Sequence, residues 1–249
     1  MIAPLLLVLA LLGAWEAYAD LGPVDSYLLP APHQVAQALL HDRSLLASNL
    51  LVTGEEIVLG MALALIAALA LAAAMHLFDT LRRAVYPLVA ASQTVPVVIL
   101  APLLVVWLGY DLAPKLALVA LVCFLPIVVS TIDGLASVDP ELLKLMRTLD
   151  ASRWQTLRRV EAPSSLPHLF SGLRIALIYA PIAAVLAEQA GSSDGLGHLI
   201  TQAIPQLLTA RAWAAVVVLS VFALVLLGCL RATQRRLLPW APAPKGVLR

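Results

Sequence analysis

The sequence predicts an all-α protein that crosses a membrane several times. Of its 249 residues, 61% are hydrophobic and only 12% are charged, and the mean hydropathy is +0.94. A soluble domain carries about a quarter charged residues, so these few charges cannot cover a water-facing surface. Six apolar segments approach the length of about 20 residues that a membrane-spanning helix needs. We therefore expect a polytopic membrane protein with six transmembrane helices, forming a single domain over residues 1–249.

The six predicted spans follow the apolar runs in chain order. We expect the first to be a retained helix rather than a cleaved signal peptide, because no Lys or Arg precedes it and Arg43 is the first basic residue. Pro96 and Pro102 break the third span, and Pro126 lies in the fourth, where a proline leaves backbone carbonyls unpaired. The spans are residues 2–19, 54–76, 84–108, 114–136, 168–190 and 212–231.

Lysine and arginine are distributed unevenly between the two sides of these spans. Thirteen of the 16 basic residues lie in or beside residues 77–83, residues 137–167 and the C-terminal tail, which leaves Arg43, Lys115 and Arg211 for the other side. Cytoplasmic loops carry the excess of basic residues, so both termini and residues 137–167 are predicted to be cytoplasmic. The formal net charge of +1 argues against a nucleic-acid partner, and membrane lipid is the expected surrounding.

Residues 137–167 differ from the rest of the chain because they are amphipathic. Asp139 fits a helix N-cap, Pro140 the first helical position and Glu141 an acidic residue in the first turn. These positions predict a helix that runs to about Leu149.

A second short helix is predicted directly after a tight corner. Ser152 and Gln155 have the spacing of a capping box, and Pro163 is expected to follow the end of this helix. Two short helices joined in this way form either a rigid knob for a soluble partner or a pair lying on the membrane with basic residues facing anionic lipid. The pattern leaves both interpretations open.

The same segment resembles the EAA loop of bacterial ABC importer permeases. That pattern is Glu-Ala-Ala, three residues, Gly, nine residues and Ile-x-Leu-Pro. Lys144, Leu145 and Met146 fall at Glu-Ala-Ala, Asp150 at the glycine and Pro163 at the proline. The last part fits well, whereas the first three residues differ. Asp tolerates the left-handed conformation that the glycine supplies, at a cost of about 1 kcal/mol.

The resemblance extends over nearly the whole chain and implies the type I importer (MetI-like) fold. Residues 27–32, 93–96, 107–110 and 195–197 match further motifs of the nitrate, sulfonate and taurine type, in the order that the family has them. Residues 187–191 and 237–240 look most like permeases for thiamine-precursor pyrimidines or riboflavin. Import of a sulfonate, taurine or nitrate by the same machinery is the alternative.

The partners are also implied by the resemblance. They are ATP-binding cassette ATPase subunits, a second permease copy and an extracytoplasmic substrate-binding protein, assembled at a bacterial inner membrane. The sequence has no Walker A motif, so ATP and Mg²⁺ are expected on the partner ATPase, and this chain is expected to be non-catalytic, without a cofactor or metal. The residues expected to couple to the ATPase are Glu141, Leu145, Met146, Asp150, Ala151, Ser152, Trp154 and Pro163.

Polar residues within the spans are candidates for the substrate pathway, because ionisable groups there are costly. The candidates are Gln93, Thr94, Tyr179, Glu188 and Gln189. An acidic residue on the path would suit a neutral or weakly basic ring better than a sulfonate.

Other ionisable residues of the spans receive simpler interpretations. Glu16, Glu55 and Glu56 lie near outer ends and are expected to touch water. Asp133 and Arg174 are expected either to pair or to snorkel toward the membrane surface.

Two other classes of function fit the sequence less well than import by an ABC transporter does. An ion-gradient transporter would show inverted repeats and helices broken near mid-membrane, and the sequence has no clear internal repeat. Residues 191–195 match the G-x-S-x-G pattern of hydrolases, with His198 nearby. That motif needs a strand–turn–helix setting, whereas here it joins two spans, so a flexible outer loop is expected.

Overall fold

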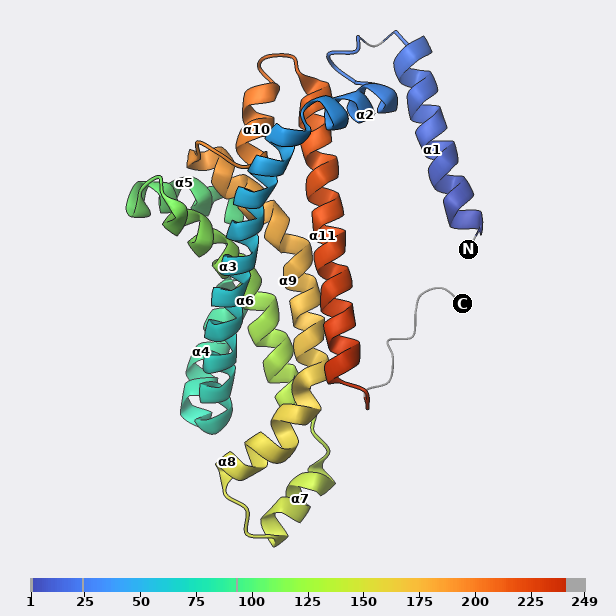
Figure 1. Cartoon of the computed structure of the whole chain (residues 1–249). Coiled ribbons are helices and arrows are strands. Elements are labelled where there is room, and N and C mark those ends of the chain that lie inside the picture. The colour runs from blue at the N-terminus through green and yellow to red at the C-terminus, as the bar shows by residue number, and fades with distance from the viewer. Residues whose placement is uncertain (1, 24, 93, 241–249) are drawn as a thin grey trace.

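A computed structural model describes residues 2–23, 25–92 and 94–240 of the chain (Figure 1). The described residues form helices and connecting loops, with no strand among them. In chain order the elements are α1 (Ile2–Leu21), α2 (Pro32–His41), α3 (Arg43–Leu77), α4 (Asp79–Ser92), α5 (Val97–Leu108), α6 (Leu112–Ala136), α7 (Pro140–Thr148), α8 (Arg153–Thr156), the π-helix η1 (Leu157–Glu161), α9 (Ala162–Gly191), α10 (Leu196–Ala203) and α11 (Thr209–Leu237).

The core is formed where α6 packs against α3 on one side and α9 on the other. Ile57, Val119, Ile127 and Ala176 are fully buried in this core. Small residues bring the helices close together, as is common in membranes, where hydrophobic attraction to lipid and to protein is similar. At Gly60 of α3, for example, a Cβ atom would lie only 2.7 Å from the side chain of Val119.

Four helices in the described part of the chain are long and apolar enough to cross a membrane: Arg43–Leu77, Leu112–Ala136, Arg153–Gly191 and Thr209–Leu237. They contain the second, fourth, fifth and sixth predicted spans. The first predicted span forms α1. The third is divided between α4 and α5, with Pro96 as the N-cap of α5. Proline lacks an N–H and disfavours helical conformation in the preceding residue, which explains the break. Pro102 and Pro126, in contrast, lie inside helices.

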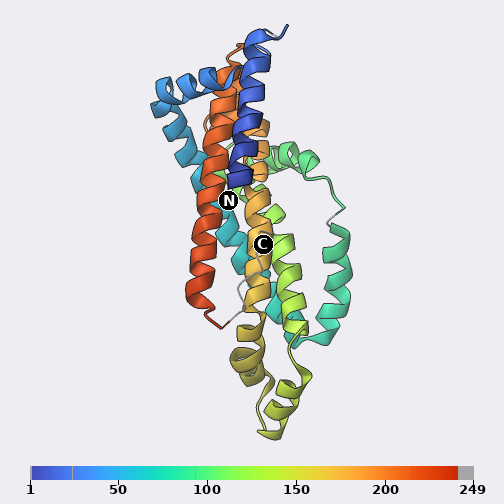
Figure 2. The same ribbon diagram turned by 90° about the vertical axis from the view of Figure 1, so that its right-hand side faces the viewer.

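The first helix lies at the edge of the bundle, beside α11 (Figures 1 and 2). Most of its described side chains are exposed. Its contact with α11 includes the rings of Trp15 and Trp213, whose centroids are 5.2 Å apart. This helix is therefore held by a few side chains rather than by the core.

The two ends of the bundle differ in charge. The corner between α3 and α4, the segment with α7 and α8, and the C-terminal end of α11 all lie at one end (Figures 1 and 2). This end carries Arg82, Arg83 and the basic residues of positions 144–159. The structure therefore gathers at one end the basic segments that the sequence predicted to share one side of the membrane.

Candidate functional site

The elbow, which we define as residues 139–161, projects from the basic end of the bundle (Figure 1). Its first helix, α7, begins as predicted. The Asp139 carboxylate accepts a 2.9 Å hydrogen bond from the N–H of Glu141, and Pro140 occupies the first helical position. The cap satisfies a backbone donor that the helix itself leaves free, which fixes where α7 starts.

The corner after α7 is also confirmed. Asp150 adopts a left-handed conformation with φ of 52°. Its N–H donates to the carbonyl of Arg147 at 3.1 Å, and the N–H of Ala151 donates to the carbonyl of Met146 at 3.0 Å. These two bonds form a Schellman motif, so Asp150 takes the place that glycine usually holds at the end of a helix.

The second helix of the elbow starts as predicted but does not end as predicted. Ser152 and Gln155 form the capping box, with hydrogen bonds of 2.9 Å and 3.2 Å. The expected end before Pro163 is wrong, because α8 runs through η1 into α9 as one continuous helix of 39 residues. Pro163 therefore lies inside this continuous helix, two residues after η1, where a proline removes one main-chain hydrogen bond. The elbow is therefore a direct extension of a membrane-spanning helix.

An apolar surface lies exposed on the elbow. Leu142, Leu145 and Leu149 are 43%, 54% and 68% exposed, and their spacing of three and four residues places them on one face of α7. Trp154 on α8 is 58% exposed. None of the residues of α7 is buried. Exposed apolar clusters of this kind mark contact sites for a partner or a membrane.

A buried polar cluster occupies the opposite end of the bundle. Lys115 of α6 lies 2.9 Å from the Glu56 carboxylate of α3, and it donates a 2.7 Å hydrogen bond to the hydroxyl of Ser192. The Lys115–Glu56 contact is an ion pair without a directed hydrogen bond. The Thr53 hydroxyl donates to the Glu188 carboxylate of α9 at 2.6 Å. Glu56 and Glu188 are both almost fully buried, so the cluster joins three core helices through charged groups.

The start of α10 is held by the same cluster. The N–H of Gly197 donates to Glu188, and the N–H of Leu196 donates to the Thr53 hydroxyl at 2.8 Å. Gly195 has φ of 107°, and a side chain there would collide with the Glu188 carboxylate. Glycine is therefore required at this position for both backbone conformation and space.

The predicted pathway residues do not form one site. Gln93 lies outside the described residues. Thr94 is exposed, and its hydroxyl donates to the carbonyl of Ala91 at 2.8 Å. On α9, Tyr179 and Gln189 are exposed, whereas Glu188 is buried with both carboxylate oxygens hydrogen-bonded inside the bundle. The structure therefore separates Glu188 from its predicted companions.

Several ionisable residues have surroundings that differ from those that the sequence predicts. Glu56 does not touch water, and Lys115 is buried rather than part of an outer loop. The position of Lys115 just inside the predicted span 114–136 is the feature of the sequence that indicates this burial. Arg174 donates to the side chain of Gln234 at 3.0 Å instead of pairing with Asp133.

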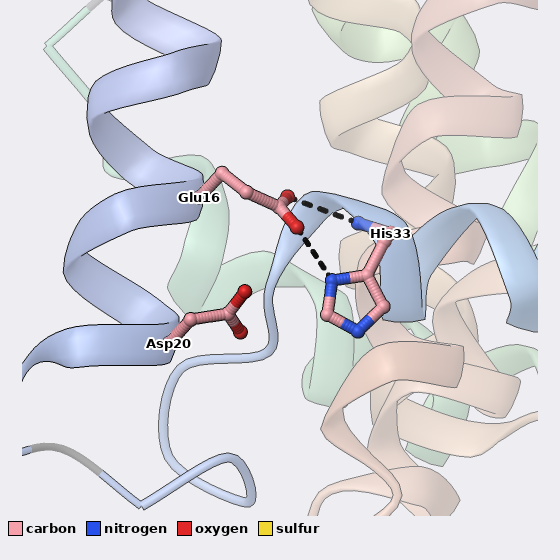
Figure 3. A group of neighbouring side chains, drawn as sticks. All are labelled: Glu16, Asp20 and His33. Carbon is pink, nitrogen blue, oxygen red and sulfur yellow. Dashed lines mark hydrogen bonds and ion pairs between the residues drawn. The ribbon is translucent and has the colours of Figure 1, made fainter.

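A second polar group joins α1 to α2, and its side chains are drawn in Figure 3. One Glu16 oxygen lies 2.6 Å from Nδ1 of His33, and the other accepts the backbone N–H of His33 at 3.2 Å. With Asp20, these side chains offer ligand atoms within 4.8 Å of one another. Because His33 occupies both Glu16 oxygens, we interpret the group as a clamp that caps the start of α2.

The segment that matches the hydrolase pattern connects α9 and α10. The Ser193 hydroxyl donates to the Asp194 carboxylate at 2.8 Å, and both residues are exposed. The segment follows a helix rather than a strand, so it lacks the setting that presents a nucleophilic serine.

Comparison with known proteins places these features in a family context. Residues 60–239 match the family described as binding-protein-dependent transport system inner membrane component. The chain is 35% identical over 238 residues to the formylaminopyrimidine transport permease protein ThiX of Halalkalibacterium halodurans, with 95% of each chain covered. It is 39% identical to the riboflavin transport system permease protein RibX of Chloroflexus aurantiacus, covering 94% of this chain and 88% of the relative. The taurine transport system permease protein TauC of Escherichia coli is 32% identical, with 92% and 86% covered.

Proposed function

The chain belongs to the family of binding-protein-dependent transport system inner membrane components, and from this premise we propose how its parts act in import. It is the permease subunit of an ABC importer. We propose that the elbow is the docking site for an ATP-binding cassette ATPase, which holds ATP and Mg²⁺. The supporting observation is the exposed apolar face of α7 on a segment that continues directly into α9.

The exposed apolar side chains of the elbow and its projection beyond the bundle both favour a soluble partner. Leu145 and Trp154 present apolar area that a partner would cover on docking, with Glu141, Ala151 and Ser152 beside them. The elbow also projects beyond the ends of α3 and α11, away from the apolar length of the bundle (Figure 1). A movement of α7 would pass through the corner at Asp150 into a spanning helix, so the partner could drive the membrane part directly.

The remaining parts of the proposal concern orientation and assembly. The excess of basic residues at the elbow end supports a cytoplasmic elbow and cytoplasmic termini. We assign the two further spans of a six-span, MetI-like arrangement to α1 and to the pair α4 and α5. A second copy of the chain would complete the pathway, and a substrate-binding protein would deliver the solute at the end with the buried polar cluster.

We propose a thiamine-precursor pyrimidine or riboflavin-type solute as the substrate. Support comes from the identity to ThiX and RibX, which exceeds the identity to TauC. The charge of Glu188 no longer supports this choice, because its carboxylate is engaged inside the bundle. Taurine or another sulfonate remains the second candidate because TauC also matches over most of its length.

Replacing Leu145 by Asp tests the docking site. A charge in the centre of an apolar contact should weaken ATPase binding by about 2 kcal/mol or more, roughly 30-fold. The measurement is the amount of ATPase subunit that co-purifies with the tagged chain from co-expressing cells. Leu28→Asp is the matched control, since Leu28 is 63% exposed outside the elbow. Equal recovery of the ATPase with both variants would contradict the proposal.

Uptake measurements test the substrate. Vesicles that contain the complete importer and its binding protein should accumulate labelled formylaminopyrimidine or riboflavin when ATP is supplied, and omission of the binding protein is the control. Accumulation of taurine alone would show that the second candidate is correct.

A further inference from the structure

The end of α3 meets the base of α9 through two side-chain contacts. Leu77 is the last residue of α3, and the last carbonyls of a helix have no partner within it. The Arg153 guanidinium donates to the Leu77 carbonyl at 3.2 Å. One residue earlier, Nε2 of His76 lies 2.8 Å from the Glu161 carboxylate. The Glu161 side chain is only 10% exposed, so His76 supplies the partner that a largely buried carboxylate needs.

These contacts lie before and at the end of a π-helical part of the long helix. Arg153 begins α8, and Glu161 is the last residue of the π-helix η1. Within η1 the hydrogen bonds reach one residue further than in an α-helix, as from the N–H of Ala162 to the carbonyl of Leu157. Such π segments are uncommon and often lie at functional sites. Here the segment through which α8 continues into α9 is tied to α3 at Arg153, before this irregularity, and at Glu161, its last residue.

The helix α7 does not fill the space beside α3. A cavity of about 250 Å³ is lined by Leu143 and Arg147 of α7 and by His76, Leu77 and Asp79 at the corner of α3 and α4. A push on α7 therefore reaches α3 mainly through α8 and η1, where the two contacts lie. The helix α9 moves with the elbow because the chain is continuous, whereas α3 follows only if side chains hold it.

We propose that His76 and Glu161, together with Arg153 on the Leu77 carbonyl, link α3 to the elbow so that the ATPase moves two spanning helices rather than one. This inference rests on the proposed docking function. His76 and Glu161 are positioning residues, because they act through the placement of α3. Since α3 packs along α6 at Gly60 and Val119, the link would carry an elbow movement into the middle of the core.

The test is the ratio of solute transported to ATP hydrolysed by the reconstituted importer. His76→Ala and Glu161→Gln should each lower this ratio by at least about fivefold, the low end of coupling effects between sites, with ATP hydrolysis and subunit association retained. The double variant should lose no more than either single variant, because both remove one contact. The exchanged pair H76E with E161H should recover part of the ratio.

Controls separate this link from stability and from the docking function. His168→Ala and Glu55→Gln change exposed residues of α9 and α3 and should leave the ratio unchanged. An unchanged ratio in both single variants overturns the link while docking stands. Loss of ATPase association in those variants also overturns it, because the residues would then serve assembly rather than coupling. If the unaltered chain assembles no ATP-hydrolysing complex, the docking function itself is wrong.

Discussion

Lys115 illustrates how single residues depend on partners inside this bundle. Its side chain is 9% exposed, and the ammonium group lies between the Glu56 carboxylate and the Ser192 hydroxyl. A buried ion pair contributes little compared with a well-packed apolar pair, but removal of one partner leaves an uncompensated charge. Lys115 therefore offsets part of the free-energy cost of burying the Glu56 carboxylate.

Replacing Lys115 by Met should destabilise the protein by about 3–5 kcal/mol, because Glu56 loses its counter-charge. The measurement is the thermal unfolding midpoint of the purified chain in detergent. Lys144→Met is the control, since Lys144 is exposed on α7 and such a change is worth about 0.5 kcal/mol or less. Adding Glu56→Gln to Lys115→Met should recover part of the loss. An unchanged midpoint for Lys115→Met would show that the pair does not matter for stability.

At the scale of elements, the elbow owes its shape to the way that α7 ends. The Schellman bonds to Arg147 and Met146 turn the chain sharply at Asp150, and the capping box at Ser152 restarts it as α8. The Schellman motif and the capping box each need only a few neighbouring residues. Together they set the direction of α7 relative to the long helix that begins at Arg153.

Asp150→Gly should stabilise the corner by about 1 kcal/mol, because glycine adopts the left-handed conformation without the clash of a Cβ atom. Asp150→Val should destabilise it, since a β-branched residue is strained at positive φ. The thermal unfolding midpoint in detergent measures both. Asp139→Gly is the contrast, because φ there is −55° and glycine brings no such gain. A lower midpoint for Asp150→Gly would argue against the corner described here.

At the scale of the whole molecule, the two ends differ in how their elements are held. The end with α10 is fastened by buried hydrogen bonds that the N–H groups of Leu196 and Gly197, the first residues of α10, donate to the side chains of Thr53 and Glu188. The other end leaves α7 uncovered and connects it to the bundle through a continuous helix and a few side chains. A permease that is moved from one side would need this difference, because an element must project to the partner while the opposite end stays assembled.

Apart from the left-handed corner at Asp150, which the resemblance to the EAA loop indicated, the sequence by itself determined the apolar helices, the cap at Asp139 and the capping box at Ser152. These features depend on hydropathy or on residues within one helical turn, so spacing alone reveals them. The break at Pro96 follows from the same local chemistry.

Only the tertiary structure decided which polar groups meet. Thr53 and Glu188 are 135 residues apart, and His76 and Glu161 are 85 apart, so their contacts depend on how α3, α6 and α9 pack. The same packing buried Glu56, which the sequence assigned to water, and Lys115, which the sequence placed on the non-cytoplasmic side, and it let α8 run past Pro163 into α9. Local patterns fix where helices begin and end, whereas the partner of a buried charge is set by helices far away in the chain.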